Sequence, residues 1–109
     1  MVEWWHPVDG STGFDILVTP TLNGPPPPIG YLSEPDTRTE RLLTMLQYTA
    51  QFNLTGQPAV SLPLHSTAGG LPVGVQFVGG FAAEAVLLRL ASQLEAAQPW
   101  ADRHPQVHG

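Results

Sequence analysis

A serine in a glycine-rich turn, Gly10-Ser11-Thr12-Gly13, is the first candidate for chemistry, because such turns can expose a hydroxyl to a substrate. A serine becomes a strong nucleophile only beside a base. The chain has no lysine, and its four histidines are His6, His65, His104 and His108. No acidic residue near His65 in the sequence could orient its ring, and no strand and helix flank Ser11. We therefore expect no catalytic residue in this chain.

Metal and cofactor sites are not predicted either. His104 and His108 have the spacing of two zinc ligands on one helix face, but Pro105 lies between them and disfavours a helix. The nine acidic residues are scattered, and cysteine is absent. The glycines between residues 69 and 80 interrupt a strand and do not form a phosphate-binding turn.

A second kind of chemistry is substrate binding by the residues Thr19, Pro20 and Thr21. They follow the apolar run Phe14 to Val18, which is typical of a strand buried on both faces. Strand ends in α/β sheets are common ligand sites, and a threonine there offers a hydroxyl or a methyl. The same hydroxyls can instead satisfy backbone groups in a turn. The pattern leaves both roles open.

The elements that would position these residues are a strand, a helix, two further strands and a last helix. After the first strand, four consecutive prolines (25–28) predict a stiff surface connection. A capping-box pattern at Thr37 to Glu40 begins a helix that should end near Asn53, before Gly56 and Pro58.

The second half of the chain predicts an extended segment at 59–64, a loop at 65–70 and a strand at 73–78. The two extended segments are expected to pair as a hairpin or to lie as near neighbours. Residues 82–97 carry apolar side chains at helical spacing and predict an amphipathic helix. Proline interrupts residues 98–109, which we expect to form a loose tail.

Composition limits the classes of protein. With 109 residues, 42% of them hydrophobic, the chain is expected to be globular and one domain at most. Its charged fraction of 12% is low beside the roughly 25% of ordinary domains, as for a fragment whose surface is covered by further protein.

A net charge of −5, with four arginines, gives no basic surface for nucleic acid or anionic lipid. No apolar run approaches the ~20 residues that span a bilayer, and the N-terminus does not resemble a signal peptide. Together with the absence of cysteine, these features predict a cytoplasmic protein that binds neither nucleic acid nor membrane.

Four motifs, in this order, resemble the C-terminal portion of the amidase signature family. They are the strand ending in Thr-Pro-Thr (15–21), Gly56-Gln57-Pro58-Ala59 with Ser61-Leu62-Pro63, the stretch Gly70 to Gln76, and the helix from Glu84 to Glu95. The likeness runs from about Trp4 to Pro99. Each motif is weak alone, but their shared order makes chance unlikely.

The resemblance implies an α/β fold, with mixed sheet strands flanked by two amphipathic helices, and the hydrolysis of carbon–nitrogen amide bonds. In that family two serines and a lysine do the chemistry, in an upstream segment that has no counterpart here. Residues 1–109 are therefore expected to be a C-terminal segment that is inactive alone. Its partner would be the upstream catalytic portion or another copy of the chain.

The same resemblance implies that Thr19, Pro20 and Thr21 lie near the substrate, with Leu46 and Gln47 approaching from the helix. Members that act on glutamine-type substrates carry an acidic residue on that helix, whereas Leu43 to Asn53 has none. A small uncharged amide is the expected substrate. Asn53, Gly56, Pro58, Gly70 and Gly74 are expected to be structural.

Two other functions stay open at this point: a binding or assembly module that has lost catalysis, and a non-functional truncated remnant. Three short strands and two helices cannot bury all their apolar faces in a chain of this size. We therefore expect an oligomer or a poorly cooperative fold when the chain is alone.

Overall fold

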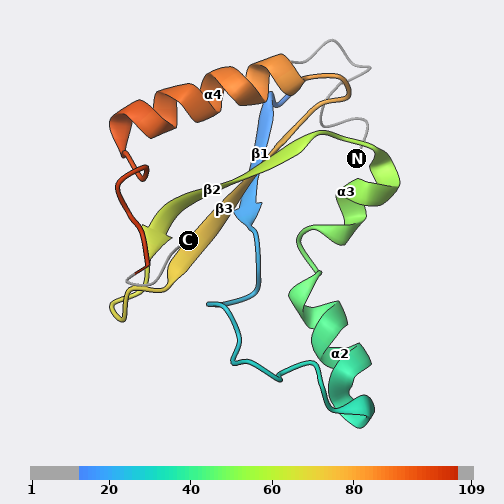
Figure 1. Ribbon diagram of the computed structural model, residues 1–109. Coiled ribbons are helices and arrows are strands. Elements are labelled where there is room, and N and C mark those ends of the chain that lie inside the picture. The colour runs from blue at the N-terminus through green and yellow to red at the C-terminus, as the bar shows by residue number, and fades with distance from the viewer. Residues whose placement is uncertain (1–12, 106–109) are drawn as a thin grey trace.

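The computed structural model describes residues 13–105, so the glycine-rich turn around Ser11 lies outside the described residues. The elements follow in the order β1 (Ile16–Pro20), α2 (Pro35–Met45), α3 (Ala50–Thr55), β2 (Ala59–Ser66), β3 (Pro72–Gly79) and α4 (Glu84–Ala97) (Figure 1). The predicted α/β class is confirmed, and the predicted order of elements holds except that two helices, α2 and α3, stand where one was expected.

The sheet has three strands in the order β1-β3-β2, all paired antiparallel. β2 and β3 form the expected hairpin, in which Gly70 adopts a positive φ of 88° that a side chain would disfavour. β1 begins two residues later than predicted, and among residues 13–105 it is an edge strand. The prediction of a strand buried on both faces is therefore wrong within the described chain, where Val18 is 56% exposed.

β2 extends two residues further than predicted, so that His65 lies in a strand and not in a loop. The pairing with β3 shifts between Leu62 and His65. Pro63, which has no N–H to donate, occupies this irregularity.

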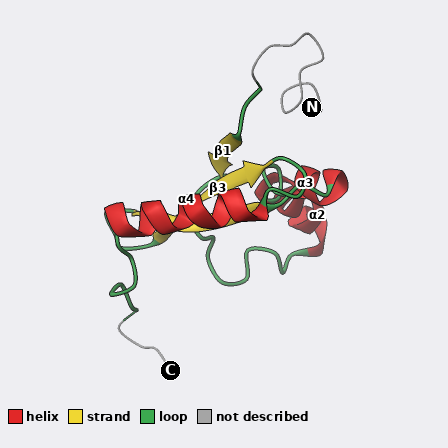
Figure 2. Cartoon of the chain, turned by 90° about the horizontal axis from the view of Figure 1, so that it is seen from above, coloured by secondary structure: helices red, strands yellow, loops and turns green. Residues whose placement is uncertain are grey.

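The hydrophobic core lies between one face of the sheet and α4. In the view of Figure 2, α4 lies over β3, which it contacts. Leu62, Phe77 and Leu87 are its buried centre. Strand alternation places Val60, Leu62 and Leu64 on this face of β2, and Leu87, Leu90 and Leu94 are spaced along one stripe of α4. Gly79 lets the start of α4 come close, because a Cβ there would lie 3.2 Å from the Cβ of Ala83.

The predicted single helix of residues 37–53 is instead two helices, α2 and α3, separated by a turn at residues 46–49. The capping box does not form, because the helix begins earlier, with Glu34 as N-cap and Pro35 as its first residue. Near the end of α2 the Thr44 hydroxyl donates to the carbonyl of Glu40 (2.9 Å), a contact that often bends helices.

The side chain of Gln76 holds the turn between α2 and α3 in place. Its side chain is 5% exposed, and its Nε2 donates to the carbonyl of Tyr48 (2.7 Å) and to the Thr19 hydroxyl (2.8 Å). A continuous helix would have used the Tyr48 carbonyl within its own backbone ladder. One buried amide on β3 thus fixes both the edge strand β1 and the turn between α2 and α3.

The segment after α4 is tied to β2 as far as Arg103. Gln98 Nε2 donates to the Leu64 carbonyl (2.6 Å), and the Arg103 guanidinium donates to the Pro63 carbonyl and to the Ser66 hydroxyl. Trp100 packs against the core. The expected loose tail is therefore wrong for residues 98–103, because β2 offers carbonyls that these side chains reach.

Only α4 makes extensive contacts with the sheet, while α2 buries none of its residues and extends away from it (Figure 1). The radius of gyration is 16.6 Å, against roughly 13 Å for a compact chain of this length. Leu43 on α2 is 65% exposed and Leu54 on α3 is 90% exposed. The expectation of a poorly cooperative or oligomeric chain is consistent with this shape and stays a prediction.

None of the helices in the described part of the chain is long and apolar enough to cross a membrane.

Gln76→Glu should destabilise the fold by about 1–3 kcal/mol near neutral pH, because a buried carboxylate cannot donate a hydrogen bond to the Tyr48 carbonyl and faces it as a second acceptor. Burial raises the pKa of such a carboxyl, so the deficit should shrink in acid, where the protonated group donates one hydrogen bond, and grow as pH rises through that raised value. Urea unfolding at neutral pH and in acid measures the loss of stability in each condition.

The control is Gln47→Glu, at an exposed position in the adjacent turn, which should change stability little. Equal losses in the two variants, or a Gln76→Glu deficit that does not depend on pH, would show that the Gln76 amide does not hold the turn.

Candidate functional site

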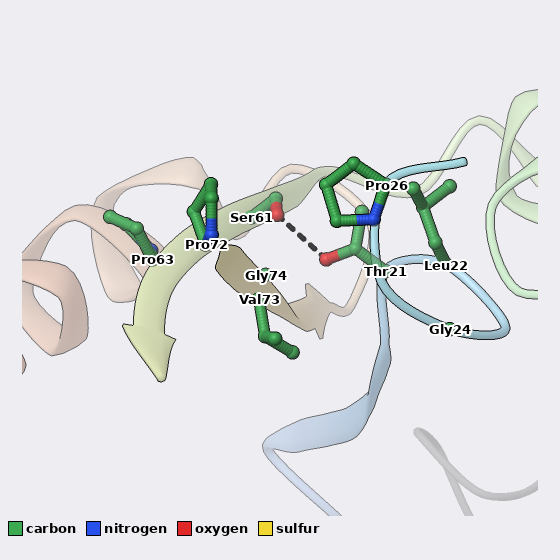
Figure 3. Close-up of a pocket in the computed structure, with 9 residues that line it drawn as sticks. All are labelled: Thr21, Leu22, Gly24, Pro26, Ser61, Pro63, Pro72, Val73 and Gly74. Carbon is green, nitrogen blue, oxygen red and sulfur yellow. Dashed lines mark hydrogen bonds between the residues drawn. The ribbon is translucent and has the colours of Figure 1, made fainter. Parts of the chain in front are cut away.

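A pocket of about 270 Å³ lies where the end of β1 meets the middle of the β2–β3 hairpin (Figure 3). The loop after β1 forms one wall and the two hairpin strands form the other. Its lining residues are Thr21, Leu22, Gly24, Pro26, Ser61, Pro63, Pro72, Val73 and Gly74. The lining contains no charged side chain.

Two hydroxyl groups are the only side-chain polar groups in this lining. Thr21 Oγ1 and Ser61 Oγ lie 2.6 Å apart, and the dashed line in Figure 3 joins them. The two residues are 40 positions apart in sequence. They meet because β1 and β2 flank β3 on opposite sides, and both side chains reach across β3 at Gly74.

The hydroxyls of Thr21 and Ser61 can approach each other only because residue 74 is a glycine. A Cβ on it would lie 2.7 Å from Ser61 Oγ and 2.8 Å from Thr21 Oγ1, closer than real Cβ atoms approach other groups. The expected structural role of this glycine is thus specific: it leaves space for the two hydroxyls above the central strand. The backbone also joins here, since the Thr21 N–H donates to the Gly74 carbonyl (3.3 Å).

The hydroxyl pair has a limited hydrogen-bonding capacity. Each hydroxyl has one hydrogen to donate, and one of the two is used between Thr21 and Ser61. The pair is left with one O–H donor and several acceptor lone pairs. This combination suits a group that both accepts and donates, such as an amide, and offers no charge to hold an ion.

The other residues expected to touch substrate are not part of the lining of this pocket. Thr19 and Pro20 are the last residues of β1. The Thr19 hydroxyl donates to the Pro20 carbonyl (2.9 Å) and accepts from Gln76, so its hydrogen-bonding capacity serves the fold. Leu46 and Gln47 lie in the turn between α2 and α3, with Leu46 38% exposed.

Ser61 is the site residue that sequence reasoning missed. It stands in the motif Ser61-Leu62-Pro63, where alternation along a strand places it on the face opposite the core residue Leu62. That alternation, together with a glycine, Gly74, on the strand expected to pair with it, was the available signal.

The histidines and acidic residues do not gather into a site in the described chain. Residues 13–105 hold no group of three or more potential metal ligands. His65 is exposed on β2, and His108 lies outside the described residues.

A second cavity of about 630 Å³ lies between the hairpin and the segment after α4. Trp100, Asp102, Arg103 and His104 line it, and it shares Pro63 and Pro72 with the first pocket. Arg103 is already engaged with β2.

Comparison with known proteins agrees with the sequence resemblance. The sequence model of the family named Amidase matches residues 4–88. The chain is 39% identical, over 96% of its length, to the 6-aminohexanoate-cyclic-dimer hydrolase of Pseudomonas sp. (strain NK87), of which it covers 22%. It is 47% identical, over 81% of its length, to the protein named "Putative amidase AmiC" of Mycobacterium leprae (strain TN), of which it covers 19%.

The fold agrees as well. A solved structure of a 6-aminohexanoate cyclic dimer hydrolase superposes with a TM-score of 0.76 and 41% identity, over 86% of this chain and 21% of that one. The chain thus spans about a fifth of the length of the relatives it matches. The family match and the shared fold lead to one conclusion: the chain belongs to the amidase family, where it corresponds to a C-terminal portion of these hydrolases.

Proposed function

We propose that this chain forms part of the substrate pocket of an enzyme that hydrolyses carbon–nitrogen amide bonds, and that it has no activity without the catalytic remainder of an amidase. The observation that carries the proposal is the uncharged pocket whose polar groups are the hydroxyls of Thr21 and Ser61. A pocket without a nucleophile–base pair can bind an amide but cannot cleave it.

The absence of lysine supports the proposal that this chain binds the substrate while the catalytic remainder cleaves it. The serine and lysine chemistry that the family resemblance implies has to come from another part of the protein. The exposed leucines of α2 and the expanded shape of the chain are in keeping with a segment that packs against more protein.

The substrate we propose is a small uncharged amide. No charged residue lines the pocket, and residues 43–53, which include the turn near Gln76, contain no acid. A charged substrate would lose hydration here without gaining a partner. One relative is named for a cyclic dimer of 6-aminohexanoate; joining the ends of an amino acid into a ring leaves amide bonds and no charged termini.

Within this proposal Thr21 and Ser61 contact the amide, while Thr19 and Pro20 hold the end of β1 in place. Leu46 and Gln47 approach the substrate from the turn once the remainder of the enzyme is present. A cytoplasmic location stays a prediction.

The direct test is a chimera in which residues 1–109 replace the matching fifth of the Pseudomonas cyclic-dimer hydrolase. We expect it to hydrolyse 6-aminohexanoate cyclic dimer within about tenfold of the parent, a barrier difference of about 1.4 kcal/mol. The 109-residue chain alone and the parent lacking that fifth should both be inactive. The measurement is kcat/KM for release of the opened dimer.

A chimera with the melting transition of the parent but no activity would contradict the proposed function. Activity of the 109-residue chain alone would contradict it as well.

Gly74→Ala should lower the stability of the chimera by about 1–3 kcal/mol, because the added Cβ overlaps both hydroxyl oxygens and forces them apart. It should also raise KM, because the separated Thr21 and Ser61 hydroxyls would no longer bind the substrate amide as a pair. Thermal unfolding and steady-state kinetics measure the two effects. Gly69→Ala, outside the pocket, is the control, because the nearest atom to the Cβ it would gain lies 3.8 Å away; equal effects of the two substitutions would refute the role of Gly74.

Ser61→Ala and Thr21→Val should each lower kcat/KM of the chimera about tenfold, roughly the loss of one hydrogen bond to substrate. The double variant should lose little more than either single one, because the hydroxyls act as a pair. Ser92→Ala, exposed on α4, is the control. Fully multiplied losses in the double variant would show that the two hydroxyls act independently.

A further inference from the structure

One wall of the pocket is a loop that gains little support from the hydrophobic core. Leu22, Gly24 and Pro26 line the pocket from this loop, and the β2–β3 hairpin forms the opposite wall (Figure 3). The helix that follows the loop, α2, buries none of its residues. The width of the pocket therefore depends on the polar contacts that hold the loop in place.

Two arginines on α2 hold the far end of this loop. Arg38 and Arg41 are three positions apart, so they lie on the same face of the helix. The Arg38 guanidinium donates to the carbonyls of Leu32 (2.9 Å) and Ser33 (3.3 Å). Arg41 donates to the carbonyl of Tyr31 (2.7 Å). Two side chains thus bind three successive carbonyls, a task that suits the planar fork of arginine better than the point charge of lysine.

Arg41 holds Tyr31 in a second way. Its guanidinium carbon lies 4.5 Å from the centroid of the Tyr31 ring, within the range of a cation–π interaction. The carboxylate of Glu34 lies 3.9 Å from the same guanidinium, but it is 69% exposed and such a pair contributes little. Arg41 therefore fixes both the backbone and the ring of Tyr31.

The segment between Tyr31 and the pocket is short and stiff. The rings of the prolines at 25–28 lock φ at each of these positions, and Pro26 lines the pocket. The Tyr31 N–H donates to the Pro28 carbonyl (3.1 Å) and closes a turn in which Gly30 has a φ of 88°, as the third residue of a type II turn requires. A displacement of Tyr31 is therefore passed on to Pro26, because few backbone rotations between them are free to absorb it.

We propose that Arg38 and Arg41 are positioning residues of the pocket: they hold the proline segment at a fixed distance from the hairpin and so set the size of the uncharged amide that fits. The inference rests on the proposed function and adds to it two residues that determine specificity. Neither arginine is part of the lining, so both act through the backbone of residues 26–33 and not through contact with the substrate.

Steady-state kinetics of the chimera test the proposal. Arg41→Met keeps an unbranched side chain but removes the donors and the charge. We expect it to raise KM for 6-aminohexanoate cyclic dimer at least about fivefold and to change kcat less than about twofold, because the wall moves while the catalytic groups of the remainder do not. A merely structural role would instead lower kcat with KM unchanged, since fewer molecules would be folded.

Two further variants serve as comparisons. Arg41→Lys keeps a cation that can donate to the Tyr31 carbonyl, and it should recover part of the increase in KM. Arg89→Met is the matched control, because Arg89 is exposed on α4, away from the loop; it should leave kcat and KM as they are.

A second measurement does not depend on activity. The chain has no cysteine, so spin labels can be attached after Ile29→Cys and Ala68→Cys, at exposed positions of the loop and of the hairpin turn. Double electron–electron resonance on the 109-residue chain then gives the distribution of distances between the labels. We expect this distribution to broaden when Arg38→Met and Arg41→Met are combined, and to stay the same with Arg89→Met.

An unchanged KM, or a loss of kcat alone, in an active Arg41→Met chimera would overturn the positioning proposal and leave the proposed function intact. Equal distance distributions with and without the two arginines would overturn it as well. A folded but inactive parent chimera, with label distances that broaden when the arginines are removed, would contradict the proposed function alone.

Discussion

β3 lies between two strands, and its side chains point alternately to the two faces of the sheet. Val75 and Phe77 face α4 and the core, while Gly74 and Gln76 face the other side. On that side Gln76 holds β1 and the turn after α2, and Gly74 makes room for Thr21 and Ser61. Without antiparallel pairing on both sides of β3, neither the hydrogen bonds of Gln76 nor the Thr21–Ser61 hydroxyl pair could form. This central position is the constraint on which the rest of the structure depends.

The pocket and the exposed apolar surface of the chain have one physical cause. A sheet of three strands with one covering helix leaves apolar side chains exposed, among them Leu43 on α2, Leu54 on α3 and Val18 on β1. In a chain that spans about a fifth of its relatives, such surfaces are what a segment of a larger core presents. The low charge content, visible in the sequence, expresses the same property.

Local patterns were enough to predict the order of elements, the hairpin and α4, because these follow from periodicity and from turn residues close in sequence. The turn inside the predicted long helix was not predictable, since it depends on Gln76, 28 residues away from the carbonyl it binds. The attachment of residues 98–103 depends likewise on carbonyls of β2. Thr21 was predicted from its place at a strand end, whereas Ser61 needed the strand order that brings it across Gly74.

The proposed role of the Thr21 and Ser61 hydroxyls is to supply the polar groups of an amide-binding pocket in a complete amidase. The most direct measurement is a crystal structure of the chimera with a non-hydrolysable cyclic diamide bound. We expect an amide group of the ligand within hydrogen-bonding distance of the Thr21–Ser61 pair. A ligand bound elsewhere, with this corner filled by side chains of the remainder of the enzyme, would contradict it.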